Sequence, residues 1–358
     1  MQVSAVLVVD DRCLSSTASN AELAYTGRSD NKSRSVACSE IFGESLLTRT
    51  VKQLRGAGIE TISVVGASIY PLSKFGAGIT RVAAARSCEC WSEAQREVLR
   101  LKAQGSQTVL MIGVSAYVEW QVEELLRFHF AHGMPLTQVH DAQGPLEIWA
   151  VNSKWFSTAA VGCTLPFRYG EFPGLPVACI IGGYVNRLAD AAGFRRLVRD
   201  GFLARSETRP LCKEIRPGVW VEDGARIHKS ARLVAPVYIG AGAKIGASAV
   251  ITRFSNVERN STVGAGTVVD SASILSDTEL GAGLELSGTV LEGNMLLDVR
   301  RNVALCIHDP NLIRDIGARY QPAIPSRRQI ERSMQAFAFS DSGFFFRAAG
   351  RLSEVLFR

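Results

Sequence analysis

"VYIGAGAKIGASAVITRFSNVERNSTVGAGTVV" spans residues 237–269, and an aliphatic residue returns in it at every sixth position. The spacing continues in both directions and gives ten consecutive matches: Val221, Ile227, Leu233, Ile239, Ile245, Ile251, Val257, Val263, Val269 and Leu275. A small residue often follows four places later, as at Ala243, Ala249 and Ser261. A period of six matches neither the α-helix nor the simple alternation of a flat strand.

A repeating coil with three six-residue steps per turn satisfies both constraints. Each step places one aliphatic side chain inside, the small residue fits where the wall bends, and successive turns stack like hydrogen-bonded strands. Glycines in "GAGAKIGAS" (240–248) supply corners, where positive φ is easiest without a Cβ. The pattern is the sequence signature of a parallel β-helix and resembles the left-handed hexapeptide-repeat family. The left-handed sense is implied by the resemblance.

The register slips by one residue after Leu275 and resumes at Leu280, Leu286, Leu291 and Leu297. We therefore expect the β-helix over 219–305, with "CIHDPNL" (306–312) as its exit.

Length and composition indicate two globular domains. The chain has 358 residues, of which 47% are apolar and 21% charged. No apolar run reaches the ~18–20 residues of a membrane-spanning helix, and we expect a cytoplasmic protein. The eight cysteines are scattered and favour reduced thiols over a disulfide framework or a metal site. No basic face interleaved with aromatic residues is evident, so nucleic acid is not an expected partner.

Residues 1–183 alternate strand-like and helix-like segments, which predicts a largely parallel α/β sheet. Helices are expected at 45–58, at 92–105, where Ser92 and Gln95 have capping-box spacing, and at 119–133. In the last of these, Leu126, His129 and Phe130 are expected on the apolar side with Val122 and Leu125.

Two of these segments resemble the sugar-1-phosphate nucleotidyltransferases. They are "IFGESLLTRTVKQLRGAGIETISVVG" (41–66) and "LLRFHFAHGMPLTQV" (125–139). The family commonly carries a hexapeptide β-helix after its catalytic domain, as expected here. The resemblance implies an NTP and a sugar 1-phosphate as substrates and Mg²⁺ as the cofactor of an active member.

The sequence departs from that family at its catalytic positions. Members have a glycine-rich phosphate loop after the first strand, but here "LVVDDRCLSSTASNAELAYT" (7–26) follows and the first glycine is Gly27. Members hold Mg²⁺ with an aspartate at the end of a central strand, but this strand ends in "MIGVSAYVEW" (111–120). No aspartate occurs between Asp30 and Asp141.

Candidate site residues are few. Asp10 and Asp11 can be read as metal ligands and Arg12 as a phosphate ligand, or all three as a solvated turn. No metal site is predicted outright. Hexapeptide-repeat acyltransferases use a histidine as general base, which makes His228 a candidate, although a surface or capping residue is the other reading.

The two remaining segments join and follow the coil. Residues 184–218 predict a helix with Leu188, Phe194, Leu197 and Val198 on its apolar side, then an extended approach in which Pro217 and Trp220 plug the open coil. Residues 340–358 predict a basic amphipathic helix, suited either to an anionic membrane or to packing on the coil or a neighbouring subunit.

The sequence thus predicts an α/β nucleotidyltransferase-like domain (1–183), a helical linker (184–218), a left-handed β-helix (219–305) and a tail (306–358). We expect a catalytically degenerate member of nucleotide-sugar or surface-polysaccharide metabolism, acting as a regulatory or scaffold subunit. An active sugar-1-phosphate nucleotidyltransferase and a hexapeptide-repeat acyltransferase are the alternatives. Expected partners are further copies of the chain, as a trimer or higher assembly, and a sugar phosphate or nucleotide sugar.

Overall fold

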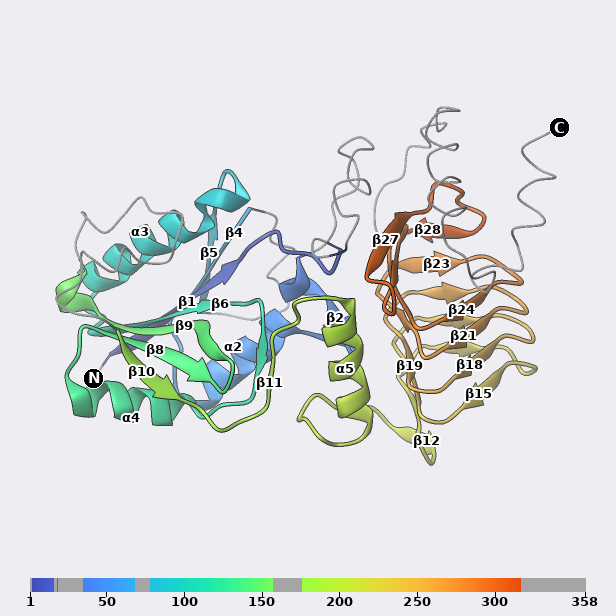
Figure 1. Ribbon diagram of the computed structural model, residues 1–358, viewed down its shortest axis with the longest axis horizontal. Coiled ribbons are helices and arrows are strands. Elements are labelled where there is room, and N and C mark those ends of the chain that lie inside the picture. Colours follow the sequence, from blue (N-terminus) through green and yellow to red (C-terminus); the bar gives the residue numbers. More distant parts are fainter. Residues whose placement is uncertain (1, 16–17, 19–34, 68–77, 157–175, 317–358) are drawn as a thin grey trace. The chain divides into compact units, whose positions relative to one another are not determined.

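The computed structural model describes residues 2–15, 18, 35–67, 78–156 and 176–316. These residues fall into two compact units (Figure 1). The N-terminal unit consists of the described residues 2–12 and 35–38 together with the described part of Ser45–Arg187. Ser39–Glu44 and the described residues from Leu188 onward form most of the coil unit. The tail segment 340–358, predicted to be an amphipathic helix, lies outside the described residues.

The N-terminal unit is built on one mixed, largely parallel sheet, with strand order β10-β8-β9-β6-β1-β4-β5. Strands β5, β4, β1 and β6 run parallel, and only β9 is antiparallel to its neighbours β6 and β8. The strand bounds are β1 Val3–Val9, β4 Ile62–Gly66, β5 Ile79–Ala83, β6 Thr108–Gly113, β8 Leu136–Asp141, β9 Gly144–Asn152 and β10 Val177–Ile180.

Helices cover both faces of this sheet, as Figure 1 shows, with α3 on one face and α2 and α4 on the other. The bounds are α2 Leu46–Gly56, α3 Cys90–Ala103 and α4 Val122–His132, so all three predicted helices are confirmed. Central strands buried on both faces read as continuous apolar runs, which explains the "VSAVLVV" and "TVLMIG" sequences of β1 and β6.

Two local predictions in these helices were wrong. Helix α3 begins two residues before Ser92, whose hydroxyl donates to the Glu89 carbonyl at 2.8 Å instead of capping the helix. A short 3₁₀ turn leads into α3, so the sequence pattern of a capping box falls inside the first turn. Phe130 was expected on the apolar side of α4 but is 37% exposed. The buried residues of α4 are Val122, Leu125 and His129.

The coil unit repeats one strand in each of three sheets, and nearly every strand of the repeat pairs in parallel with the third strand after it. One sheet contains β13 Val219–Val221, β16 Val237–Ile239, β19 Ser255–Val257, β22 Ser273–Ile274 and β25 Thr289–Glu292. The second contains β14 Arg226–Ile227, β17 Lys244–Ile245, β20 Thr262–Val263 and β23 Thr278–Leu280. The third contains β15 Arg232–Val234, β18 Val250–Thr252, β21 Val268–Asp270 and β24 Glu285–Ser287.

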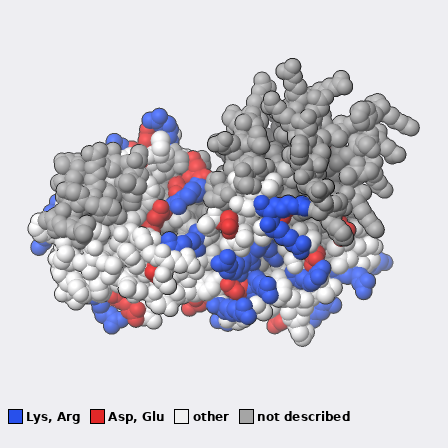
Figure 2. All heavy atoms as spheres, viewed as in Figure 1, with Lys and Arg blue, Asp and Glu red and all other residues white. Residues whose placement is uncertain are grey.

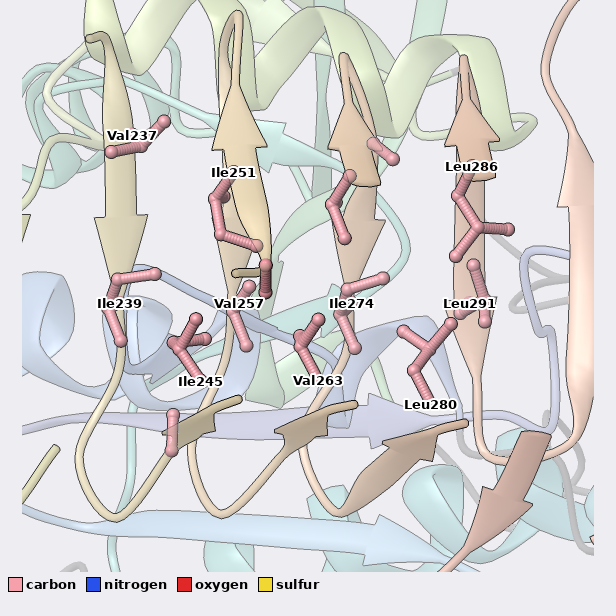
Figure 3. Close-up of a cluster of buried hydrophobic side chains, with 14 of the residues drawn as sticks. Val237, Ile239, Ile245, Ile251, Val257, Val263, Ile274, Leu280, Leu286 and Leu291 are labelled. Carbon is pink, nitrogen blue, oxygen red and sulfur yellow. The ribbon is translucent and has the colours of Figure 1, made fainter. Parts of the chain in front are cut away.

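The aliphatic residues of the six-residue ladder lie in one dry core, as expected (Figure 3). Ile239, Ile251, Val257 and Val263 are completely buried, and Ile245 nearly so. Stacking of turns places each such side chain against its equivalents in the turns before and after, so the interior continues along the unit.

Small hydroxyl residues at the bends connect successive turns. Ser261 Oγ donates to the Leu275 carbonyl at 2.7 Å and accepts the Thr278 N–H at 3.3 Å. Thr267 does the same with Gly281 and Leu284. Ser255 accepts the Ala272 N–H at 3.2 Å, while its own proton goes to the Thr252 carbonyl. The small residue therefore satisfies buried backbone groups of the next turn as well as fitting the bend.

The register slip occurs one step earlier than the sequence suggested. Val237 pairs with Ser255, eighteen residues later, but Asn256 pairs with Ser273, seventeen later. The connection through Ser271 and Ala272 is one residue shorter than the equivalent connection in the preceding turn. Ile274 therefore occupies the core position assigned to Leu275, and Leu296 the one assigned to Leu297.

The regular repeat ends at β25 rather than near residue 305. Strands β26 (Met295–Asp298) and β27 (Val303–Cys306) continue that sheet antiparallel, and β28 (Ile313–Asp315) pairs antiparallel with β23. These reversals cover the last turn, which would otherwise expose strand edges and apolar interior.

The start of the repeat also differs from prediction. Val219 and Val221 point into the core, whereas Trp220 lies outside with its ring 5.6 Å from that of Phe202, so Trp220 does not plug the coil. Strand β12 (Glu214–Arg216) pairs antiparallel with β13 and covers its edge, while Pro217 is exposed. Phe202 ends α5 (Ala191–Phe202), the helix expected in 184–218, which Asp190 caps.

Among the described residues, no helix is both long and apolar enough to cross a membrane.

Candidate functional site

The carboxyl end of β1 carries the predicted residues Asp10, Asp11 and Arg12. The Arg12 guanidinium forms ion pairs with both Asp10 and Glu147, and Glu147 comes from β9. Ser115 Oγ, just beyond the end of β6, donates to Glu147 Oε2 at 2.9 Å. The structure therefore brings Asp10 and Arg12 together with two residues that the sequence reading did not single out, while Asp11 is exposed.

The charges of this β1-end cluster compensate one another only in part. Partial burial acts to lower the pKa of Arg12, but the carboxylates of Asp10 and Glu147 outweigh it and raise the pKa above its ordinary value. One guanidinium between two carboxylates leaves the three side chains with a net charge of about −1. Such a cluster repels a phosphate group instead of attracting it.

Gly113 at the end of β6 makes room for this arrangement. A Cβ at Gly113 would lie 2.6 Å from Glu147 Oε2 and 3.1 Å from Trp91 Cζ2. The glycine at this strand end is therefore explained by close packing of Glu147.

A small pocket lies beside the cluster, between α2 and the ends of β6 and β9. It has a volume of about 20 Å³, and its polar lining includes Arg49, Gln53, Ser115 and Glu147. Gln53 Nε2 donates across it to the Val118 carbonyl at 3.1 Å. This space holds about one water molecule, whereas small-molecule sites measure roughly 300–1,000 Å³.

The residues at the end of β1 do not fit a magnesium ion. Mg²⁺ requires oxygen ligands gathered around one point in near-octahedral geometry. Here the guanidinium of Arg12 stands between the carboxylates of Asp10 and Glu147. Within the described ranges, no group of three or more His, Cys, Asp or Glu side chains is arranged to hold a metal ion.

His228 lies exposed just after β14. Its Nδ1 accepts the Ser230 N–H at 3.2 Å and lies 2.8 Å from Ser230 Oγ. An Nδ1 that accepts a backbone N–H leaves the ring proton of neutral imidazole on Nε2. This arrangement favours the capping reading of His228, since its Nδ1 is engaged by Ser230 within the same turn.

The most buried ionisable group of the coil unit is Glu258, on the outer side of the sheet that contains β19. It accepts the N–H groups of Phe42 and Gly43 at 2.9 and 3.0 Å and the Asn256 amide at 2.7 Å. Burial raises the pKa of Glu258 to about 7, although hydrogen bonds from Asn256, Gly43 and Phe42 oppose the shift. The Glu258 carboxylate thus helps to hold the segment Ser39–Glu44 on the coil, together with Arg259, which donates to the Gly43 carbonyl, and Ser276, which donates to Glu40.

Arg195 of α5 extends the same network. Its guanidinium donates to Ser273 Oγ at 2.6 Å, to the Phe254 carbonyl at 2.7 Å and to Asn256 Oδ1 at 3.2 Å. Desolvation lowers the pKa of Arg195 to about 10. Asn256 therefore links a buried cation to a buried anion, and the network anchors α5 and Ser39–Glu44 to one sheet.

Tyr238 completes this face. Its hydroxyl donates to Glu222 Oε1 at 2.7 Å, and its ring lies 5.2 Å from that of Phe42. Burial raises the pKa of Tyr238 above its ordinary value. Glu258, Asn256, Arg195 and Tyr238 are each hydrogen-bonded to other groups of the fold, and these bonds join α5 and Ser39–Glu44 to the coil.

Glu147, Asn256 and Glu258 were not predicted, because their surroundings depend on long-range pairing. Asn256 and Glu258 look like ordinary solvent-facing residues in the sequence, and only segments distant in the chain bury them. Glu147 stays partly exposed and reaches the end of β1 only because β9 pairs beside β6. Asn256 and Glu258, two polar residues two places apart in "SNVERN" (255–260), were the sequence signal that could have revealed the buried network.

Comparison with known proteins gives distant likeness to solved structures alone. No protein-family model and no curated protein matches the chain. Solved structures with a similar fold include HddC from Yersinia pseudotuberculosis, at 10% sequence identity and a TM-score of 0.40. The match covers 55% of this chain and 97% of HddC. A likeness of this size is distant in fold and says nothing about activity.

Proposed function

We propose that this protein is a non-catalytic, nucleotidyltransferase-like subunit that serves as a regulatory or scaffold component in nucleotide-sugar or surface-polysaccharide metabolism. The observation that carries the proposal is the β1-end cluster. Arg12, the one cation of that cluster, is engaged by Asp10 and Glu147, which leaves a net negative charge where the related enzymes receive phosphates.

The second part of the proposal concerns the coil unit. We take its three-sheet repeat as a left-handed β-helix that associates with further copies of the chain, as a trimer or higher assembly. Support comes from the unbroken parallel pairing through the repeat and from its continuous apolar core. A rigid unit of this kind presents fixed outer faces for assembly without a conformational change.

A thermal-shift series tests the first part. Purified full-length protein is heated with ATP, GTP, CTP, UTP or dTTP, each with and without Mg²⁺. A ligand that binds the native state tightly stabilises it by mass action and raises its melting temperature. A ligand concentration of 100 times the Kd adds about 2.7 kcal/mol of stability. We expect no Mg²⁺-dependent stabilisation, and a clear shift with one nucleotide would overturn the proposal.

The same series with sugar 1-phosphates and nucleotide sugars tests the partner expected for a regulatory subunit. A shift with a nucleotide sugar but with no NTP agrees with a sensing role. A shift with none of these compounds leaves scaffolding as the role.

Light scattering coupled to size exclusion tests self-association. We expect a mass of three or more chains at micromolar concentration. A single-chain mass at every concentration would contradict assembly through the coil.

A further inference from the structure

Exposed aliphatic side chains gather around the first turn of the repeat. Leu211 is 70% exposed, Ile215 52% and Val234 47%, and these are three of the eight large hydrophobic residues exposed among the described residues. No side chain of β12 is buried, so its backbone pairing with β13 holds it in place.

These side chains belong to neighbouring segments. Arg216 of β12 donates to the Leu233 carbonyl, which is adjacent to Val234 in β15. The Lys213 carbonyl accepts the Val221 N–H at 3.3 Å and holds the chain after Leu211 alongside β13. In the described residues β14 and β15 have no strand on their outer side, so this end of the repeat is open.

The same area is basic. Its exposed cations are Lys213, Arg216, Arg226, Lys229 and Arg232, against the exposed acids Glu214 and Asp223. The Glu214 carboxylate already accepts the Gly218 N–H at 2.6 Å. Figure 2 shows Lys and Arg side chains gathered over the part of the coil unit where Figure 1 places α5, β12 and β15. Together with Leu211, Ile215 and Val234, these five cations define what we name the first-turn surface.

We propose that the first-turn surface binds the headgroup region of an anionic phospholipid bilayer. Aliphatic side chains that project among cations suit an interface whose outer layer is negative and whose depth is apolar. In this mode Leu211 and Ile215 enter the acyl boundary, and Lys213, Lys229 and Arg226 contact phosphates. This inference goes beyond the proposed function, since neither catalytic silence nor self-association requires a membrane.

Charge argues against the other occupants. Residues 317–358 contain seven basic and three acidic residues, so this tail and the first-turn surface repel each other. A second copy docking the same surface brings like charges together as well. A soluble polyanion satisfies the cations but leaves Leu211, Ile215 and Val234 exposed to water.

Vesicle sedimentation with the full-length chain tests the proposal. We expect binding to phosphatidylcholine vesicles containing about a third phosphatidylglycerol, little binding to pure phosphatidylcholine, and a marked loss between ~0.05 and ~0.5 M salt. The double variant Leu211→Ser/Ile215→Ser and the double variant Lys213→Gln/Lys229→Gln are each expected to weaken binding at least about tenfold.

Matched controls remove the same residue types elsewhere. Ile180→Ser takes away an isoleucine that is 77% exposed in the N-terminal unit, and Arg81→Gln/Arg127→Gln removes two exposed cations there. Neither control is expected to change binding, and circular dichroism melts establish that every variant folds.

Three results overturn the proposal. The first is no binding to anionic vesicles at low salt. The second is vesicle binding that both first-turn variants retain. The third is binding of soluble poly-glutamate that exceeds vesicle binding and is weakened by Lys213→Gln/Lys229→Gln. If the first-turn variants retain binding, Phe344→Ser/Phe345→Ser reports whether the tail is responsible. None of these results bears on NTP binding or chain mass, which test the proposed function separately.

Discussion

Single hydroxyl groups add to the strand pairing that joins successive turns of the repeat. Ser261 and Thr267 each donate to a carbonyl fourteen residues ahead and accept an N–H seventeen residues ahead. Ser255 accepts the equivalent N–H. Alanine fits the same bend by size, as Ala243 and Ala249 do in the earlier turns. The hydroxyl is needed where the following turn leaves backbone groups to satisfy.

Ser261→Ala is expected to lower the free energy of unfolding by about 1–3 kcal/mol, because it leaves a buried carbonyl and a buried N–H without their partner. Urea unfolding followed by circular dichroism measures the change. Thr262→Ala, one residue along on the outward side, is the control and is expected to stay within about 0.5 kcal/mol. Equal effects at both positions would show that the hydroxyl of Ser261 contributes nothing.

Glu258 makes the stability of the coil unit depend on pH. The folded pKa of about 7 lies above the ordinary value of 4.5, so the folded state holds the proton more tightly than the unfolded state. Stability from this group is complete below about pH 4.5 and is lost as pH rises through about 7, by up to about 3 kcal/mol. Unfolding measured between pH 4.5 and 8 should show the decline in the native chain and a flatter profile in Glu258→Gln. A profile that is the same in both chains would mean that Glu258 titrates normally.

Gly43 is required by its backbone and by its surroundings. Its φ is +80°, and a Cβ there would lie 2.5 Å from Glu222 Oε1 and 2.9 Å from the Tyr238 hydroxyl. Gly43→Ala is expected to cost about 1–3 kcal/mol and to lower the melting temperature. Gly56→Ala at the end of α2 meets no atom within 4 Å and should be neutral or slightly stabilising. Equal melting temperatures for the native chain and Gly43→Ala would refute this account of Ser39–Glu44.

At the scale of the element, the strand is the unit that the six-residue pattern encodes. Ile251→Ala is expected to destabilise by about 2–5 kcal/mol, because it opens a cavity in the core shared by adjacent turns. Its neighbour Val250 points outward and is only partly buried, so Val250→Ala should cost well under half as much. Chemical denaturation of the two variants distinguishes them, and similar losses would contradict the inward assignment of Ile251.

Much of the fold follows from local pattern, and the rest depends on long-range pairing. Ladder residues up to Val269 were predictable because each step has the same length. The choice of Ile274 over Leu275 was not predictable, since both are aliphatic and only pairing of Asn256 with Ser273 decides between them. Antiparallel β26 and β27 were missed because their apolar residues continue the spacing of the coil.

The candidate site was less predictable than the fold. Asp10 and Arg12 could be found because they end the first strand. Glu147 could not, since it joins them only through the antiparallel placement of β9 beside β6. The same applies to Glu258, whose burial depends on residues more than two hundred positions away.

At the scale of the whole molecule, the described residues divide the work between two units. The N-terminal unit has a largely parallel sheet with an ion-paired cluster at the end of β1. The coil unit offers long outer faces, a buried polar network and an open, basic first turn. The proposals above give assembly and surface attachment to the coil unit and no transfer chemistry to the N-terminal unit.

Pyrophosphate release tests this account most directly. The full-length chain is incubated with each common NTP, a panel of sugar 1-phosphates and Mg²⁺, and phosphate from added pyrophosphatase is followed against a blank without protein. The account predicts no release above the blank for any pair. Release that requires one NTP together with one sugar phosphate, and that Arg12→Gln abolishes, would contradict it.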